Sequence, residues 1–158
     1  MAPVLCSNGM SVLPHVSFDS CQQLDYLLLP GGSGTRAEVG NPPLVEFVAK
    51  QATGCRAALS VCTGSFVLHA AGLLSGRRAT THWGSLDRLR SFTDVTVVEA
   101  RFVQDGNVST SAGVSAGIDL MLAFISSVAS EEAAGKVQFA SEYYPSTVKH
   151  GGFARRSL

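Results

Sequence analysis

A cysteine stands on the boundary between an expected strand and an expected helix, in the segment "LSVCTGSF" at 59–66. The apolar run before Cys62 is typical of a buried strand, and the residues after it are typical of a buried helix. Two positions to either side of it stand Ser60 and Gly64, which are small, as a backbone that folds sharply back on itself requires. The arrangement Ser-x-Cys-x-Gly predicts a nucleophile elbow with Cys62 as the nucleophile.

The start of a helix also favours the reactive form of a cysteine. The first N–H groups of a helix have no partners within it and form the positive end of its dipole, so they favour a thiolate over a thiol. A tightly packed strand–helix junction that buries an inert cysteine accounts for the same five residues. The elbow pattern alone leaves both readings open.

Two further motifs follow predicted strands and can complete a site around Cys62. His82 comes directly after the short strand expected at 79–81, where its ring can reach the same crevice and act as a base or an acid; a histidine that only caps a helix is the alternative. Gly31-Gly32 ends the strand expected at 25–29 and can bring a backbone N–H beside that of Thr63, forming a two-donor pocket for an oxyanion. The alternative there is a plain turn.

The rest of the chain alternates expected strands and helices, which predicts an α/β fold with a mostly parallel sheet. We expect a three-layer sandwich with helices on both faces and a small antiparallel hairpin turning at Asp105-Gly106. The remaining strands are expected at 56–61, 95–98, 100–104 and 107–111, and the helices are expected to begin near 41, 64, 83, 115 and 130. Sites in such sheets form at the carboxyl ends of the strands, where Gly32, Cys62 and His82 all lie.

Two helices of the last third carry apolar faces. In the helix beginning near Ser115, one face holds Ile118, Met121, Leu122 and Ile125. In the helix beginning near Ser130, Val137 and the pair Phe139-Ala140 are expected to point to the core. The tail from 145 to 158 is expected to be irregular.

Length and composition predict one domain, 1–158, without a linker or repeat. With 158 residues, 46% of them hydrophobic, the chain can bury a sizeable core. Twelve basic and twelve acidic side chains cancel, which disfavours nucleic acid and anionic membranes as partners. No apolar run approaches the roughly 20 residues of a membrane span, and the first residues lack the pattern of a signal peptide, so the cytoplasm is the expected location.

The four cysteines show neither metal-ligand nor disulfide spacing. No CxxC pair is present, so no metal site and no disulfide framework are expected. Apart from Cys62, they are read as small buried hydrophobes: Cys6, Cys21 and Cys55.

Three ordered segments resemble a known family: "DYLLLPGGSGTR", "LSVCTGSFVLHAAGLLSGRRATTHW" and "RFVQDGNVSTSAGVSAGIDLMLAFI". From about residue 12 to residue 144, the chain is similar to the DJ-1/PfpI superfamily, with its class I glutamine-amidotransferase-like, flavodoxin-like fold, and most of all to its isonitrile hydratase branch. The resemblance implies that Cys62 is the elbow nucleophile, that Thr63 helps to position it, that Gly32 supplies a backbone donor, and that His82 lies nearby. It also implies a small-molecule substrate, no cofactor and a homodimer.

The chain departs from the family at its N-terminal side. Family members usually begin with a strand, a helix and a second strand before the segment that Met1 opens here. That portion carries the acidic residue that hydrogen-bonds the cysteine sulfur, and none of the twelve carboxylates occupies its place in the order. Asp119 is read as structural, favoured in the first turn of a helix. An N-terminally truncated domain is thus expected to expose apolar surface where the absent strand belongs.

The leading functional hypothesis is a hydratase in which the Cys62 thiolate attacks a small electrophile such as an isonitrile, and water releases an N-substituted formamide. Three alternatives stay open. The same cysteine suits glyoxalase-type chemistry on methylglyoxal, and an accessible reactive thiol suits redox or ligand sensing without turnover. A truncated member without catalysis is the third. The chain shows no basic stripe for DNA.

Overall fold

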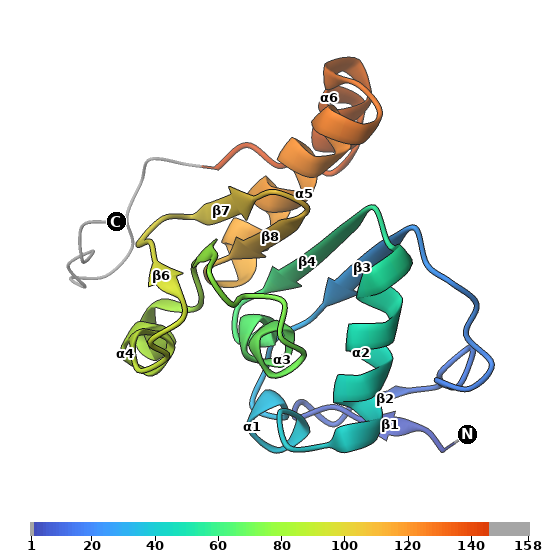
Figure 1. Ribbon diagram of the computed structural model, residues 1–158. Coiled ribbons are helices and arrows are strands. Elements are labelled where there is room, and N and C mark those ends of the chain that lie inside the picture. Colours follow the sequence, from blue (N-terminus) through green and yellow to red (C-terminus); the bar gives the residue numbers. More distant parts are fainter. Residues whose placement is uncertain (1, 146–158) are drawn as a thin grey trace.

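The centre of the molecule is a four-stranded sheet, seen in a computed structural model that describes residues 2–145 (Figure 1). Three strands are parallel, and the fourth closes an antiparallel hairpin at one edge. In order across the sheet, the strands are β3 (Tyr26–Leu29), β4 (Ala57–Val61), β8 (Val108–Ser111) and β7 (Phe102–Asp105). The hairpin is the one predicted at Asp105-Gly106, where Gly106 adopts the φ of +60° that such a tight turn requires.

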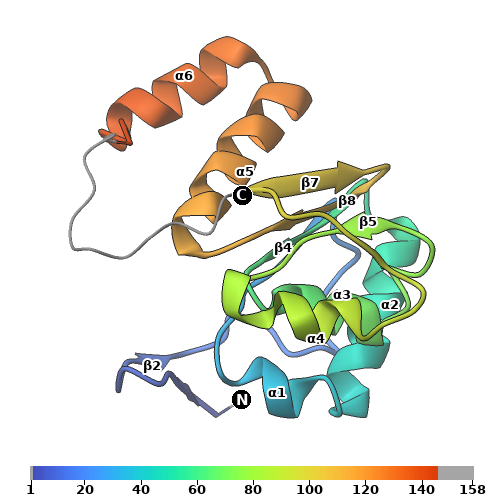
Figure 2. The same ribbon diagram turned by 90° about the vertical axis from the view of Figure 1, so that its left-hand side faces the viewer.

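Helices cover both faces of the sheet, as Figure 2 shows. On one face lie α2 (Pro42–Gly54) and α3 (Gly64–Ala70); on the other lies α5 (Val114–Val128), against which α6 (Glu131–Ala140) packs. Two short helices are α1 (Thr35–Glu38) and α4 (Leu86–Arg90), the latter after the 3₁₀ turn Trp83–Ser85. The predicted α/β sandwich is confirmed.

The main hydrophobic core lies between the sheet and the pair α2 and α3. Leu27 and Leu29 enter it from β3, and Ala58 enters it from β4. Phe66 and Leu68 close it from α3, at 2% and 0% exposed. Because side chains alternate along a strand, Leu28 points to the opposite face.

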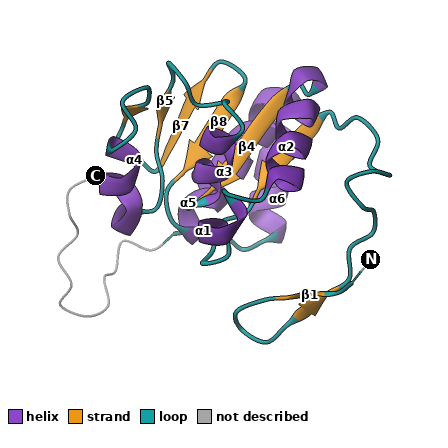
Figure 3. Cartoon of the chain, turned by 60° about the horizontal axis from the view of Figure 1, so that its bottom comes forward, coloured by secondary structure: helices purple, strands orange, loops and turns teal. Residues whose placement is uncertain are grey.

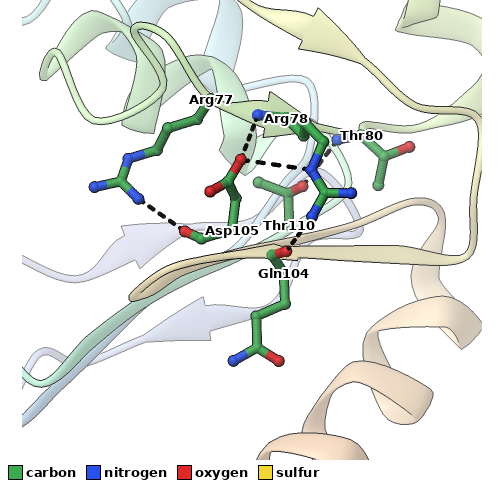
Figure 4. Close-up of polar contacts among 6 residues, drawn as sticks. All are labelled: Arg77, Arg78, Thr80, Gln104, Asp105 and Thr110. Atoms are coloured by element: carbon green, nitrogen blue, oxygen red, sulfur yellow. Dashed lines mark hydrogen bonds and ion pairs between the residues drawn. The ribbon is translucent and has the colours of Figure 1, made fainter.

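The strand predicted at 79–81 belongs to a separate two-stranded sheet. Here β5 (Arg78–Ala79) pairs in parallel with β6 (Thr96–Val97). Figure 4 shows how this unit is fixed to the β7–β8 hairpin: an Asp105 carboxylate oxygen accepts the Arg78 N–H at 2.8 Å, and Thr110 Oγ1 accepts the Thr80 N–H at 2.8 Å. These bonds fix the position of the next residues, which reach the Cys62 elbow.

An N-terminal hairpin was not predicted. It pairs β1 (Val4–Leu5) with β2 (Ser11–Val12) and lies apart from the central sheet (Figure 3). All four of its strand residues are exposed. At the other end of the chain, the predicted irregular tail lies outside the described residues from 146 onward.

The buried residues of α5 are not those of the apolar face singled out from the sequence. Ala116, Gly117 and Leu120 are buried, and a Cβ at Gly117 would lie 2.9 Å from a Val61 methyl group. Ile118 is 41% exposed. The glycine lets the helix approach β4 closely, and this turns the larger side chains to the flank.

The predicted inward side of α6 is wrong. Val137 and Phe139 are 42% and 75% exposed, and Ala134 is buried instead. The helix begins as expected, with Ser130 Oγ accepting the Ala133 N–H at 3.1 Å. Because α6 lies outside α5 and does not reach the sheet, only a narrow strip of it is covered.

Asp119 is structural, but not through the first turn of its helix. It is the sixth residue of α5, where its carboxylate pairs with the Arg101 guanidinium and accepts a hydrogen bond from the Tyr143 hydroxyl at 3.0 Å. Desolvation and the Asp119 carboxylate raise the pKa of the Tyr143 hydroxyl, which keeps it protonated as a donor. This cluster connects α5 both to the start of β7 and to the segment after α6.

Strand β3 is an edge of the sheet within the described part of the chain. It pairs with β4 on one side, and Leu28 on its α5 face is 47% exposed. Leu28 therefore presents an apolar side chain at this edge. Among residues 2–145, no helix combines the length and apolar character that crossing a membrane requires.

Candidate functional site

The turn between β4 and α3 has the geometry of the predicted elbow. Cys62 directly follows β4 and has a φ of +58°, in the left-handed region that a residue with a Cβ seldom adopts. Its N–H donates to the Ser111 carbonyl at 3.0 Å. Its own carbonyl accepts hydrogen bonds from the Thr81 hydroxyl at 3.0 Å and from the Ser65 hydroxyl at 3.2 Å. Three segments therefore hold the strained residue in place.

Glycines permit the loop after β3 to press against the elbow. A Cβ at Gly64 would lie 2.3 Å from the Leu29 carbonyl oxygen, far inside contact distance. A Cβ at Gly31 would lie 2.7 Å from the Cys62 Cβ and 2.8 Å from the Thr63 nitrogen. Because Gly31 and Gly64 have no side chains, the loop after β3 lies directly against Cys62 and Thr63.

Hydroxyl groups link Gly32 to the elbow. The Gly32 N–H donates to Thr63 Oγ1 at 2.9 Å. Thr35 Oγ1, at the start of α1, lies 2.7 Å from the Gly32 carbonyl oxygen and 3.0 Å from Thr63 Oγ1. Gly32 holds a φ of +132°, which favours glycine. Thr63 is thus in contact with both the loop and the cysteine.

The predicted two-donor pocket has one donor already engaged. Because Thr63 Oγ1 accepts the Gly32 N–H, a ligand oxygen has to replace this hydroxyl before it can bind that amide. The roles of Gly31, Gly32 and Thr63 in holding an oxyanion stay predictions.

The Thr35 side chain gives a first test of this network. Thr35→Val keeps the shape but removes the hydrogen bonds from the Thr35 hydroxyl to the Gly32 carbonyl and to Thr63 Oγ1, so we expect the free energy of unfolding to fall by about 1 kcal/mol. Thr35→Ser restores most of this loss. Urea denaturation measures both. The control is Thr53→Val, because the exposed Thr53 hydroxyl only bonds the Lys50 carbonyl of its own helix. Equal losses at Thr35 and Thr53 would contradict the proposed network.

Ser60, two residues before Cys62, carries a buried hydroxyl without a partner among the described residues. Ser60 and Ser65 are both 0% exposed, but Ser65 bonds the Cys62 carbonyl. Ser60→Ala is therefore expected to raise the free energy of unfolding by about 1 kcal/mol, and Ser65→Ala to lower it by a similar amount. Thermal denaturation of the pair gives the signs. A loss of stability in both variants would show that Ser60 has a partner.

His82 lies beside the elbow, but its ring is engaged elsewhere. The hydroxyl of the preceding residue, Thr81, donates to the Cys62 carbonyl. The His82 ring instead accepts the Gly84 N–H at Nδ1, at 3.2 Å, and so caps the 3₁₀ turn. A Cβ at Gly113 would lie 3.6 Å from the His82 ring. Within residues 2–145, no hydrogen bond joins His82 to Cys62. A role of His82 as base or acid stays a prediction, whereas its capping role is supported by the hydrogen bond from Gly84.

The four cysteines differ in their surroundings. All are free thiols; Cys55 is buried, and the other three are partly exposed. Burial raises the pKa of the Cys55 thiol, which disfavours its thiolate form near neutrality. In the described part of the chain, Cys62 Sγ has no hydrogen bond from a carboxylic acid, and no group of three metal-ligating side chains gathers.

Sequence reasoning missed the polar groups that hold the elbow: Thr35, Ser65, Thr81 and Ser111. Hydroxyl residues are common in turns, so none of these carries a signal of its own. Thr35 and Thr81 stand within the conspicuous segments "GGSGT" and "ATTHW", close to predicted site residues. Only the folded backbone shows which hydroxyl faces which carbonyl.

Comparisons with known proteins point in one direction. The model of the DJ-1/PfpI family matches residues 1–127. Isonitrile hydratase of Pseudomonas putida is 40% identical over 145 residues, which is 92% of this chain and 63% of the hydratase. The HTH-type transcriptional regulator CdhR of Pseudomonas aeruginosa is 40% identical over 124 residues, 78% of this chain and 37% of the regulator. The chain thus spans less than two thirds of the length of either relative.

A solved structure agrees with these similarities. A THiJ/PfpI family protein from Pseudomonas syringae superposes with a TM-score of 0.88 at 36% identity, over 96% of this chain and 63% of that one. Drosophila melanogaster DJ-1beta superposes with a TM-score of 0.79 at 24% identity, over 90% and 78% of the two chains, which supports the fold alone.

Proposed function

Because the chain belongs to the DJ-1/PfpI family, we propose that it is a cysteine-dependent enzyme that adds water to a small electrophile such as an isonitrile. The observation that carries this proposal is the strained backbone of Cys62, at a φ of +58° directly before α3. Strain of this kind persists where the surroundings enforce it, and it collects at functional sites. The 40% identity to an isonitrile hydratase supports the substrate class.

The proposed chemistry uses the cysteine twice. The thiolate adds to the terminal carbon of the isonitrile, a C–S bond forms, and a solvent proton reaches the same carbon. Water then adds to this carbon, the C–S bond breaks, and the N-substituted formamide leaves while the thiolate is regenerated. We assign the positioning of Cys62 to Thr63, and the stabilisation of developing charge to the amides of Gly32 and Thr63. His82 is the candidate base.

The direct test is a product assay. The purified chain is incubated with a small aliphatic isonitrile, and the formamide is measured by gas chromatography. A parallel incubation with methylglyoxal measures lactate, which tests the glyoxalase-type alternative. Formamide without lactate supports the hydratase, whereas lactate alone assigns the other activity. If neither formamide nor lactate forms, the proposed enzymatic function is refuted.

A second candidate function is sensing by oxidation of Cys62. Its support is the similarity to transcriptional regulators, together with the partial exposure of a free thiol at the elbow. After mild peroxide treatment, mass spectrometry should find sulfinic acid mainly at Cys62. Cys6 and Cys21 are also partly exposed and serve as internal references. Similar oxidation of all three thiols would remove this candidate.

We further propose a cytoplasmic homodimer. Free thiols at four positions suit a reducing compartment. The exposed edge strand and apolar flank supply a surface on which a second copy can pack. Sedimentation velocity at several concentrations tests the dimer.

A further inference from the structure

A cavity of about 160 Å³ lies at the end of the sheet opposite Cys62. Tyr26 and Ala57, the first residues of β3 and β4, pair in register and line it from the sheet. Phe124 and Val128 line it from the last turns of α5. Since Cys62 follows the last residue of β4, the length of that strand, roughly 13 Å, separates the cavity from the elbow. The cavity is therefore distinct from the site described above.

One wall of the cavity is apolar. The rings of Tyr26 and Phe124 meet edge to face, with centroids 5.1 Å apart. Val128 is 41% exposed and continues this wall along α5. An aromatic or aliphatic group of a ligand can pack against these surfaces and leave water.

The other side of the cavity carries polar side chains that keep hydrogen-bonding groups unused by the described residues. The Arg56 guanidinium lies 5.3 Å from the centre of the Tyr26 ring, and no carboxylate among residues 2–145 pairs with it. Ser109 is 5% exposed, and its hydroxyl forms no hydrogen bond with the described residues. The side-chain Oδ1 of Asn107 accepts from the Arg77 guanidinium at 3.4 Å, which leaves the side-chain NH₂ group as a donor.

No carboxylate among residues 2–145 neutralises Arg56: Asp25 lies beside it across the β3–β4 pair, but the contact is between backbone atoms, the Asp25 carbonyl accepting the Arg56 N–H at 2.7 Å. Asp105, at the turn of the β7–β8 hairpin, accepts the Arg78 N–H at 2.8 Å and pairs with the Arg78 side chain at 3.7 Å. An unpaired guanidinium, a buried hydroxyl and an amide beside an aromatic wall favour an anion with two acceptor oxygens and a flat body.

We propose that this cavity binds a small aromatic carboxylate of the size of benzoate. The carboxylate pairs with Arg56 and accepts from Ser109 and Asn107, while the ring packs on Tyr26 and Phe124. This pocket of about 160 Å³ is open to solvent and has room for one benzene-sized ring, since a volume of about 150 Å³ holds benzene. Binding here is non-covalent and does not depend on the chemistry proposed for Cys62.

The test is a titration of the ¹⁵N-labelled chain with benzoate, followed by two-dimensional NMR. We expect saturable shifts that concentrate at 26, 56–57, 107–109 and 124–128. Arg56→Met keeps the stem over Tyr26 and removes the charge, so the dissociation constant should rise about tenfold to a hundredfold. Ser109→Ala should weaken binding by a smaller factor. Benzyl alcohol, which lacks the charge, should bind both proteins equally weakly.

Two controls make the result specific. Arg88 also lies over an aromatic ring, 4.3 Å from the centre of Phe66, but it does not line the cavity, so Arg88→Met should leave benzoate binding unchanged. Cys62→Ser should also bind benzoate normally, whatever its effect on turnover. The proposal is overturned if no saturable shifts appear up to about 10 mM, if they centre on the elbow, or if Arg56→Met binds benzoate as the parent does.

Discussion

Cys62→Ala reduces formamide production from a small isonitrile by at least about 10³-fold, the scale of losing a catalytic nucleophile. The variant removes the sulfur and keeps the Cβ, so the strained elbow backbone, with its φ of +58°, stays close to the parent geometry. The measurement is the initial rate of product formation at saturating substrate. Cys6→Ala and Cys21→Ala, which remove two other partly exposed thiols, should retain the full rate. An active Cys62→Ala enzyme would refute the mechanism.

The same position also tests whether function accounts for the strain. A glycine adopts a positive φ without steric cost, so Cys62→Gly should be more stable than Cys62→Ala by about 1 kcal/mol. Both variants lack the thiol and should be inactive. A more stable but inactive protein would show that the elbow holds Cys62 at a cost in folding stability. Equal stabilities would show that the neighbouring hydrogen bonds fully relieve the strain.

Gly64→Ala lowers the free energy of unfolding by about 3 kcal/mol or more, because its Cβ would lie 2.3 Å from the Leu29 carbonyl oxygen. A backbone atom cannot rotate away as a side chain can, so β3 and α3 have to separate. Urea denaturation measures the loss, and the elbow activity should fall with it.

The matched control is Gly135→Ala in α6. There a new Cβ would meet nothing within 4 Å, so the helix should gain about 0.5–1 kcal/mol. The same chemical change thus has opposite signs at the two glycines. A small effect at Gly64 would mean that the approach of β3 to the elbow is looser than the structure shows.

Two strands of the sheet could be predicted from the sequence because they are short apolar runs beside glycine or proline, and the other two because the Asp105-Gly106 turn joins them. The segment Tyr26–Leu29 ends at Pro30, and Ala57–Val61 ends at the elbow. Both runs are buried or partly buried on at least one face, so composition alone identifies them. The position of Cys62 followed from the small residues around it, since a sharp turn excludes larger ones.

The predictions that failed concern side chains whose burial or contacts are determined by tertiary packing. Val137 and Phe139 have apolar side chains, but nothing in the sequence shows that α6 packs on another helix and not on the sheet. Gly117 drew no attention, although its missing side chain decides which face of α5 meets Val61. For His82, the sequence suggested a reach toward Cys62, and the folded chain shows its ring bonded to Gly84. Each of these depends on contacts distant in sequence.

The outer side of β3 has a consequence for the chain in solution. Edge strands of soluble proteins usually carry a lysine, a proline or a bulge that discourages further pairing, whereas Tyr26–Leu29 is apolar throughout. Among the described residues no strand pairs with the outer peptide groups of β3, so they form a template onto which a further strand can grow, and Leu28 adds an apolar contact beside them. This border of the sheet therefore favours self-association at high protein concentration, independently of any chemistry at the cysteine.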